Sequence, residues 1–284
     1  MDRKKTGTKE WAETTENIQL GCPHGCRYCY AQYDAVKWHK WCTAEQWLVP
    51  VIVCWKVHRS FLKRLGVIMF PSTHDITKRN ISECIHVLRT MLEAGNKVLV
   101  VSKPHYNCIK EICLDFTKYR RQLSFRLTIG SMDPAVLSFW EPNAPCFEER
   151  FQSLKYAREC GYQTSISCEP FLDSDLNKII NLYETLKPLV TNSFWIGKLR
   201  KFDRRVELLD VPYSDVRRFV HPLKAAQIDD SIWIIVEQLR NEKLIRWKDS
   251  IVEALERGSG KKIIPGFKPI DLGTAWGTPE GGLP

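Results

Sequence analysis

Three cysteines in one short loop are the residues of this chain best suited to chemistry. Cys22, Cys26 and Cys29 stand at C-x3-C-x2-C spacing within residues 21–30, a stretch that also holds two glycines and a proline. Glycine and proline let the backbone turn back, so that three sulfurs can converge on one point. Three converging thiolates form a soft site, which suits zinc, copper(I) or an iron–sulfur cluster.

The number of ligands narrows this choice. A structural zinc site and an ordinary electron-transfer cluster each take four protein ligands as a rule. Three cysteines without an evident fourth therefore indicate a four-iron cluster with one iron left open to another molecule. A zinc knuckle completed by His24 or Cys42 is the alternative, although the spacing fits paired C-x2-C zinc motifs poorly. A disulfide framework is less favoured, because the 11 cysteines are odd in number and scattered through apolar segments.

Composition sets the broad class of the protein. The 284 residues are 44% hydrophobic, enough for one large α/β domain or two small ones. No apolar run is long enough to cross a membrane, and residues 1–5 lack the apolar stretch of a secretory signal. We therefore expect a cytoplasmic protein with no membrane partner. The formal net charge of +9 permits a nucleic-acid partner without requiring one.

Strand and helix patterns alternate along the chain. We expect strands at 17–20, 67–70, 98–101, 124–130, 164–169 and 192–199, and helices at 80–94, 109–116, 146–160 and 174–187. Such repeats with short links indicate a parallel sheet, and right-handed crossovers would curl six strands into a partial barrel. We therefore predict an α/β fold, a partial (β/α)6 TIM-like barrel over residues 1–200. Residues 201–284 are expected to form a basic, helical C-terminal extension with a Gly/Pro-rich tail.

Two of the expected strands carry polar side chains on one face. The positions that share this face are Ser124, Arg126, Thr128, Ser165, Ser167 and Glu169. In parallel α/β folds, ligands bind beyond the carboxyl ends of the strands. The polar faces therefore predict a barrel lumen that holds a ligand instead of closing dry.

Residues 31–65 interleave aromatic and basic side chains. The set comprises Trp38, Trp41, Trp47, Trp55, Lys37, Lys40, Lys56, Arg59, Lys63 and Arg64. Such a mixture can bind nucleic-acid bases by stacking and phosphates by charge. We favour the alternative, an amphipathic helical layer with its tryptophans in the core, because their positions partly keep helical spacing.

The cysteine spacing, read as C-x3-C-x-aromatic-C with Tyr28 as the aromatic residue, resembles the motif of the radical S-adenosylmethionine (SAM) superfamily. The resemblance implies a 4Fe-4S cluster in which Cys22, Cys26 and Cys29 bind three irons and the fourth iron binds SAM. One electron, from a donor such as ferredoxin or flavodoxin, then cleaves SAM to a 5′-deoxyadenosyl radical that takes a hydrogen atom from the substrate. The protein places the radical and excludes water.

Other pieces of the chain are similar to the spore photoproduct lyase branch of this superfamily. They are Glu141-Pro142, Arg150, the turn at 157–161 and Glu169-Pro170, and the similarity covers about residues 17–200. Residues 7–11 also resemble the start of phage-associated radical SAM proteins with no settled function. True photoproduct lyases carry a hydrogen-donating cysteine in the stretch that matches residues 71–75, which has none here. Thymine-dimer repair by that route is therefore not expected.

The resemblance also assigns site residues by position. Those expected to bind the cofactor are Tyr28, Thr73, Lys103, Thr128, Ser167 and Glu169. Lys103, at the end of the third strand, would bind the SAM carboxylate as a point charge, and Glu169 would accept hydrogen bonds from the ribose hydroxyls. An ordinary ion pair at the barrel rim is the alternative for both. Tyr28 would lie on the adenine side of SAM, and Thr128 at its methionine or ribose end.

His74 and Asp75 are the candidate catalytic residues, because they offer acid–base or hydrogen-bonding groups at the mouth of the site. The alternative is a turn and N-cap that start the next helix. The rim residues after the sixth strand, together with two lysines after the cysteine loop, could track a phosphate backbone: Arg200, Lys201, Arg204, Arg205, Lys37 and Lys40. We therefore expect a radical SAM enzyme acting on a nucleobase in DNA or RNA. The alternatives are a peptide or small-metabolite substrate, or a non-catalytic zinc-binding protein associated with nucleic acid.

Replacing Cys22, Cys26 and Cys29 together by alanine should abolish the broad visible absorption of protein purified without oxygen, because nothing else would hold the irons. Replacing Cys42 or Cys54 by alanine should leave the absorption intact. Visible spectra and iron analysis make the measurement. A triple variant that keeps its full iron content would contradict the cluster assignment.

Overall fold

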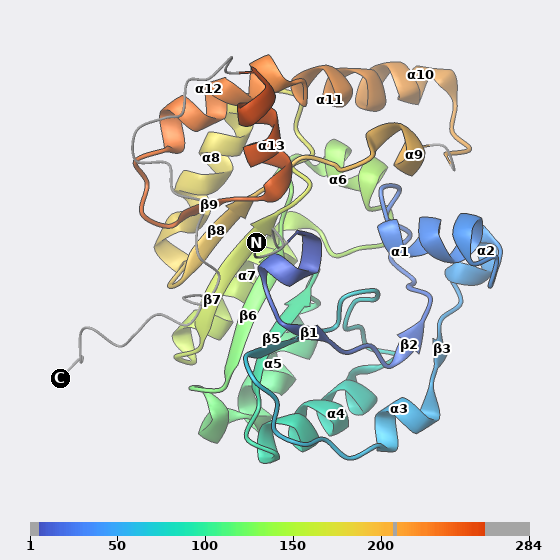
Figure 1. Cartoon of the computed structure of the whole chain (residues 1–284), viewed down its shortest axis with the longest axis vertical. Helices are drawn as coiled ribbons and strands as arrows, with labels where there is room; N and C mark the ends of the chain where they lie inside the picture. The colour runs from blue at the N-terminus through green and yellow to red at the C-terminus, as the bar shows by residue number, and fades with distance from the viewer. Residues whose placement is uncertain (1–5, 207–208, 259–284) are drawn as a thin grey trace.

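A curved parallel sheet forms the centre of the fold. The structure is a computed structural model that describes residues 6–206 and 209–258. Within them, seven strands lie in the order β1 (Thr14–Thr15), β4 (Val67–Phe70), β5 (Lys97–Ser102), β6 (Leu123–Thr128), β7 (Gln163–Cys168), β8 (Ser193–Ile196) and β9 (Ile245–Trp247). All neighbouring strands are parallel. The sheet curls into a half-barrel (Figure 1), which confirms the predicted partial barrel.

Helices connect the strands and cover the outer face of the sheet (Figure 1). The longer ones are α4 (Ile81–Glu93), α5 (Tyr106–Asp115), α6 (Pro134–Trp140), α7 (Phe147–Glu159), α8 (Leu176–Leu186), α12 (Asp229–Leu239) and α13 (Asp249–Gly258). In α4 the buried side chains recur at helical spacing, from Cys84 through Leu88 to Leu92. Gly95, with φ of +80°, follows directly and supplies the left-handed conformation that ends such a helix.

Shorter elements complete the chain. They are η1 (Gly7–Glu10), β2 (Gln19–Leu20), α1 (Tyr30–Tyr33), η2 (Asp34–Trp38), α2 (Ala44–Trp47), β3 (Val51–Ile52), α3 (Cys54–His58), η3 (Thr117–Tyr119), η4 (Lys187–Leu189), α9 (Phe202–Val206), α10 (Tyr213–Asp215), η5 (Val216–Val220) and α11 (His221–Ala226). No helix among the described residues has the length and apolar character needed to span a membrane.

The two faces of the sheet differ in chemistry because side chains alternate along each strand. The outer positions pack against the helices in the main core and include Ile68, Val98, Val100, Phe125, Ile166 and Phe194. On the inner face, β4, β5 and β8 bury apolar side chains with Trp11: Val67, Met69, Leu99, Val101 and Trp195. The inner positions of β6 and β7 are instead Ser124, Arg126, Thr128, Ser165 and Ser167, which line two cavities. The predicted polar lumen is therefore confirmed.

The strand predictions need two corrections. Residues 17–20 were expected to begin the sheet, but β1 at Thr14–Thr15 does so, and β2 pairs antiparallel with β3 outside the sheet. A seventh strand, β9, comes from the segment expected to be an extension. The sequence did not predict β1 because a strand of two residues shows no alternation. It did not predict β9 because Arg246 interrupts its apolar run. The expected Gly/Pro-rich tail lies outside the described residues.

The N-terminal segment bridges the two edges of the half-barrel. The Gly7 N–H donates to Asp249 Oδ2 at 3.3 Å, and the Asp249 N–H donates to Glu10 Oε1 at 2.9 Å. Lys248 Nζ donates to the Gly7 carbonyl at 2.9 Å. In Figure 1, η1 accordingly lies in front of the sheet, between its first and last strands. The N-terminal segment thus partly closes the open side of the half-barrel.

Residues 19–58, from β2 to α3, form a lobe beside the barrel, and we use that name below (Figure 1). Trp47 of the lobe is buried, but Trp38, Trp41 and Trp55 are 64%, 67% and 65% exposed. The favoured interpretation of these tryptophans as core residues is therefore wrong for three of the four. Helical spacing misled it because η2 and α2 are separate short elements, not one continuous amphipathic helix.

Asp173, between β7 and α8, gives the fold a pH dependence. Burial raises the pKa of its carboxyl from 3.8 to about 6. A raised folded-state pKa means that the associated stability is fully present below pH 3.8 and is lost as pH rises through about 6. Asp173→Asn should therefore raise the free energy of unfolding at about pH 8, by up to about 3 kcal/mol, and change it little at about pH 4.

Urea unfolding at the two pH values checks this expectation. Asp230→Asn, at an exposed position, is the matched control and should show no such difference. A gain from Asp173→Asn that is equal at both pH values would contradict the assignment.

Candidate functional site

One cavity of about 590 Å³ opens beyond the carboxyl ends of the strands. Its size lies within the range of roughly 300–1,000 Å³ that is usual for ligand sites. Every residue that the sequence placed in the site lines it: Cys22, Cys26, Tyr28, Cys29, Thr73, His74, Asp75, Lys103, Thr128, Ser167 and Glu169. The residues at strand ends meet there because a parallel sheet brings all its carboxyl ends to one edge.

The cysteine loop is held in a sharp turn. Gly21 has φ of +85°, and a Cβ at this position would lie 2.5 Å from the Trp47 carbonyl oxygen, so only glycine fits. From the other side, the Asn143 amide donates to the Pro23 carbonyl at 3.1 Å, and the Asn143 N–H donates to the His24 carbonyl at 3.2 Å. The loop is thus held between α2 and the segment after α6.

The three cysteines are thiols with raised pKa values. None of the described cysteines forms a disulfide. Burial is the largest cause that raises the pKa of Cys26 and Cys29, and it brings that of Cys22 to about 12. Such thiols ionise when a metal ion supplies the compensating positive charge. Three sulfurs on one cavity wall are therefore a donor set that fits an iron–sulfur cluster.

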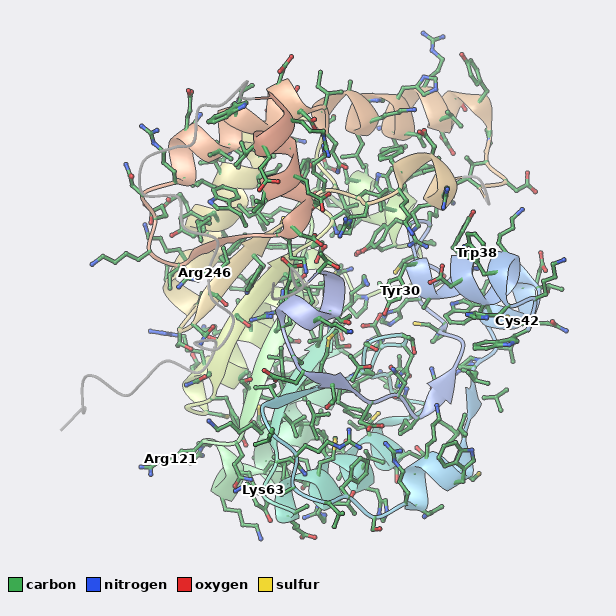
Figure 2. All side chains as sticks on the ribbon, in the orientation of Figure 1. Tyr30, Trp38, Cys42, Lys63, Arg121 and Arg246 are labelled. Carbon is green, nitrogen blue, oxygen red and sulfur yellow. The ribbon has the colours of Figure 1, made fainter. Side chains whose placement is uncertain are left out.

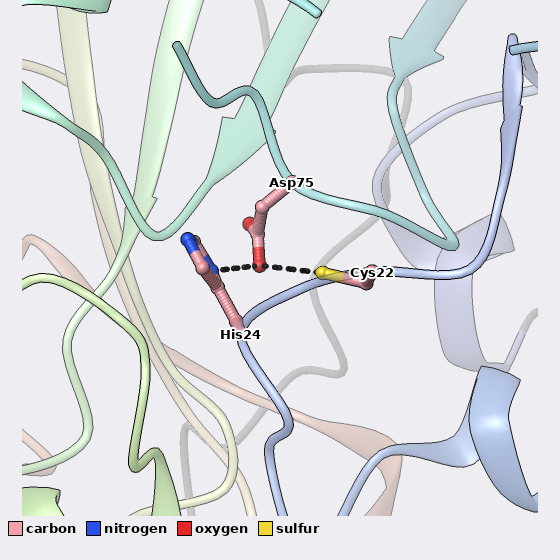
Figure 3. Close-up of side chains that lie close together, drawn as sticks. All are labelled: Cys22, His24 and Asp75. Atoms are coloured by element: carbon pink, nitrogen blue, oxygen red, sulfur yellow. Dashed lines mark hydrogen bonds and ion pairs between the residues drawn. The ribbon is translucent and has the colours of Figure 1, made fainter. Parts of the chain in front are cut away.

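Asp75 joins the cysteine loop to the sheet (Figure 3). Its Oδ2 lies 2.9 Å from His24 Nδ1 and accepts from the Cys22 thiol at 3.9 Å. Its Oδ1 accepts from the Lys103 N–H at 2.7 Å and from the Ser102 hydroxyl at 2.9 Å. Burial would raise the pKa of Asp75, but the Lys103 ammonium and His24 outweigh it and hold the pKa well below its usual value.

Cys22, His24 and Asp75 also form a compact group whose ligand atoms lie within 4.8 Å of one another. This group includes His24, one of the two candidates to complete a zinc site. Both ring nitrogens of His24 already have partners, because Nδ1 contacts Asp75 and Nε2 lies 3.3 Å from His105 Nε2. The geometry therefore favours a hydrogen-bonding role for His24.

His74 is fixed by two backbone groups. The Ile18 N–H donates to its Nε2 at 3.2 Å, and its Nδ1 donates to the Asp75 carbonyl at 3.2 Å. Burial lowers the pKa of His74 to about 4, so the ring is neutral near pH 7. With both ring nitrogens bonded and the Asp75 carboxylate holding the loop, the geometry favours positioning roles for these two residues. Their predicted catalytic roles stay predictions.

Lys103 projects an ammonium group into the cavity. Its Nζ lies 5.5 Å from the centre of the Tyr28 ring and 3.8 Å from Asp75 Oδ2. Burial would lower the pKa of Lys103, but the surrounding anionic groups, Asp75 and Glu141 among them, raise it above its usual value. The side chain therefore stays charged where a ligand carboxylate can reach it.

A buried ion pair supports Tyr28 from behind. The Tyr28 hydroxyl donates to Glu141, which pairs with the completely buried Arg150. Arg150 also donates to the Thr128 carbonyl at 3.1 Å and to the Pro145 carbonyl at 2.7 Å. The pair thus connects the cysteine motif with the end of β6. The sequence marked Glu141 and Arg150 only as signs of a resemblance and did not predict this support.

Glu169 lies in an ion pair that the sequence missed. Its Oε2 is 3.3 Å from Nζ of Lys248, a buried residue that follows β9 and also pairs with Glu10. Burial is the largest cause that raises the pKa of Glu169. Lys248 carries no local signal, because its partners are distant in the sequence and its strand was not predicted. The rim ion pair considered as an alternative is therefore present, with Lys248 as the partner.

The predicted cationic rim is largely engaged within the protein. Arg200 pairs with Asp249 and with Glu253, at 3.2 Å for the latter. Arg205 donates to the Tyr30 carbonyl at 3.2 Å and lies over the ring of Tyr33. Of the four rim residues after β8, only two are exposed, Lys201 and Arg204. The rim can therefore offer fewer cations to a phosphate backbone than the sequence suggested.

Two solved structures share this architecture. Spore photoproduct lyase complexed with dinucleoside spore photoproduct superposes with a TM-score of 0.51 at 14% identity, over 82% of this chain and 75% of that one. Streptococcus suis SuiB bound to precursor peptide SuiA gives 0.52 at 12% identity, over 86% and 50%. Both are radical SAM enzymes.

The chain shares the partial-barrel fold of these two enzymes. It spans half the length of SuiB. It is 25% identical over 167 residues to an uncharacterised protein of Acidianus two-tailed virus, covering 54% of each chain. It is also 25% identical over 184 residues to an uncharacterised protein of Methanocaldococcus jannaschii, covering 63% of this chain and 67% of that one. No protein-family model matches the chain.

Lys103→Ala should weaken SAM binding by roughly tenfold to a hundredfold, the usual value of a hydrogen bond to a charged group. Its thermal midpoint should fall because Asp75 loses the nearby ammonium, but the fold should survive because Asp75 keeps its contacts with His24, the Ser102 hydroxyl and the backbone at position 103. Equilibrium dialysis with labelled SAM on anaerobically reconstituted protein gives the affinity. Lys110→Ala, at an exposed position of α5, is the control. Unchanged SAM affinity would refute the role of Lys103.

Proposed function

We propose that the protein is a radical SAM enzyme. Its 4Fe-4S cluster would be bound by Cys22, Cys26 and Cys29, and SAM would occupy the adjoining cavity. The observation that carries the proposal is the convergence of three thiols, two buried and one half-buried, and the Lys103 ammonium on one cavity, at the edge of the barrel where such folds bind ligands. The donor set and the size of the cavity fit both groups.

When bound, the cluster and SAM supply a 5′-deoxyadenosyl radical that takes a hydrogen atom from the substrate. The chain's own residues would bind and orient SAM. Lys103 would bind the SAM carboxylate, Thr128 its methionine or ribose end, and Glu169 its ribose hydroxyls. Thr73 and Ser167 add hydroxyl groups on the same cavity wall. The segment from Thr6 to Trp11 lines the cavity as well and would keep water from its side.

The substrate we propose is a nucleobase in DNA or RNA, with ferredoxin or flavodoxin as the electron donor. Within the part of the chain that the structure describes, six lysine and arginine side chains line the cavity against two acidic ones, Asp75 and Glu169, and this balance favours an anionic substrate. One neighbour in fold was solved with a dinucleoside photoproduct, and the other with a precursor peptide. A peptide or small metabolite is therefore the alternative.

Hydrogen donation to the product radical would differ from that of true photoproduct lyases. Among the described residues that line the cavity, the cysteines are Cys22, Cys26 and Cys29, all assigned to the cluster. Ser72 lies in the stretch that matches the donor cysteine, and its O–H bond is far harder to break homolytically than S–H. Base modification is thus favoured over dimer repair.

Reduced, cluster-loaded protein should slowly convert SAM to 5′-deoxyadenosine and methionine without added substrate, because cleavage needs only cluster, electron and SAM. Liquid chromatography of quenched reactions measures both products. The variant with Cys22, Cys26 and Cys29 changed to alanine is the control and should give none. Absence of 5′-deoxyadenosine from protein with full iron content would contradict the proposed function.

The zinc alternative is separated by metal analysis. The group of Cys22, His24 and Asp75 is the observation that favours it. Stoichiometric zinc without iron and sulfide in anaerobically purified protein would support a non-catalytic zinc-binding protein.

A further inference from the structure

The lobe displays three tryptophans to solvent. Trp38, Trp41 and Trp55 expose about two thirds of their surface each, at 64%, 67% and 65%. Figure 2 shows Trp38 on the lobe, away from the barrel. Trp41 stacks on the His39 ring and Trp55 has Lys56 over its ring, yet each tryptophan leaves most of its surface to solvent. Large exposed apolar surface marks interaction sites.

Each of these tryptophans has a lysine beside it in the sequence. The pairs are Lys37-Trp38, Lys40-Trp41 and Trp55-Lys56. Nζ of Lys56 lies 5.6 Å from the Trp55 ring centre. Between residues 30 and 59 the chain has four lysine and arginine residues and only two acidic ones, Asp34 and Glu45. The sequence of the lobe therefore repeats a pair of one tryptophan and one lysine, and in the Trp55-Lys56 pair the two side chains lie close together.

This repeated unit distinguishes between the classes of partner. The centres of protein–protein interfaces are enriched in tryptophan but depleted in lysine. Single-stranded nucleic acid, by contrast, is bound by aromatic rings that stack on successive bases and by cations that contact the phosphates. A repeating unit also suits a repeating polymer. The chemistry of the lobe therefore matches a nucleic-acid strand better than a protein surface.

The lobe is also placed to pass a strand toward the cavity. Trp38 ends η2, and Tyr30, which begins the preceding α1, is 40% exposed and lines the cavity. Nine helical residues extend over roughly 13 Å, a distance that a few nucleotides cover. Figure 2 places Tyr30 between Trp38 and the barrel. The Arg200 and Arg205 side chains, which line the cavity, are engaged in internal contacts, so phosphate contacts of a strand would fall mainly to the lysines of the lobe.

We infer that the lobe is a docking surface for single-stranded DNA or RNA, which stacks bases on Trp38, Trp41 and Trp55 and binds phosphates through Lys37, Lys40 and Lys56. This inference rests on the proposed function only in naming the bound strand as the substrate. A base of the docked strand reaches the cavity past Tyr30. Unstacking one base from a single strand costs less than extruding it from a duplex, so single strands are preferred.

The test is fluorescence anisotropy with a labelled mixed-sequence DNA strand of about twenty nucleotides, over a range of salt concentrations, on the full cluster-loaded protein. Each single change of Trp38, Trp41 or Trp55 to alanine should weaken binding by roughly fivefold to a hundredfold. Phenylalanine at the same positions should restore most of the affinity, which a mere loss of charge or fold would not explain.

The lysines are tested by the salt dependence. Changing Lys37, Lys40 and Lys56 together to glutamine should reduce the slope of log affinity against log salt by about 2. The matched control removes the same charge from three exposed lysines on the outer side of the barrel, Lys110, Lys118 and Lys155, and should leave the slope unchanged.

The tests of strand binding can fail without contradicting the proposed function. The tryptophan variants should keep full 5′-deoxyadenosine formation from SAM without substrate, because these side chains do not line the cavity. Strand binding that is absent at low salt, or unaffected by the alanine changes, would overturn the inference. So would slower reduction of the cluster by an acidic flavodoxin in the tryptophan variants with strand binding intact, which would assign the lobe to the electron donor.

Discussion

The carboxylate of Asp75 connects the three segments on which the cavity depends. It receives hydrogen bonds from the end of β5, at Ser102 and the Lys103 backbone, and it contacts His24 in the cysteine loop. A buried carboxylate is expensive unless it is hydrogen-bonded and near opposite charge, and here both conditions hold. The cysteine loop has little secondary structure of its own, so this carboxylate is one of the groups that set where its sulfurs lie relative to the sheet.

A second buried charge acts from the opposite side of the loop. Glu141 and Arg150 are both fully buried, and together they hold the Tyr28 hydroxyl and the carbonyl of Thr128. Removing one partner of such a pair leaves an uncompensated buried charge, whereas the intact pair fixes geometry. The cysteine motif is therefore held by Asp75 on one side and by the Glu141–Arg150 pair on the other. Apolar side chains could not replace these groups, because apolar contacts do not fix the direction of a hydrogen bond.

The sequence predicted those features of the fold and the site that depend on patterns of residues close together in the chain. Alternating strands and helices gave the partial barrel, and the spacing of Cys22, Cys26 and Cys29 marked the cavity that later proved to collect all the assigned residues. Patterns failed where structure depends on distant partners. Lys248 is buried only because Glu10 and Glu169 meet it across the barrel. Thr14–Thr15 is a strand only because β4 lies beside it.

The aromatic side chains of the lobe show a different limit. Spacing along the chain says which positions share a helix face, but not whether anything packs against that face. Trp47 packs against the cysteine loop and is buried, whereas Trp38 and Trp55 are about two thirds exposed. Whether a side chain is buried depends on the assembled fold. A tryptophan on a short helix at the edge of the fold can therefore be either buried or exposed.

The bridge between η1 and β9 also determines when the site is complete during synthesis. Glu10 and Asp249 are separated by 239 residues, so their contact forms only after almost the whole described chain has left the ribosome. Contacts with such large sequence separation are among the slowest to form. Until then the cysteine loop and the strands around it stand in a trough open to solvent. Closing that trough is one of the last steps of folding, because it joins residues translated early to partners translated late.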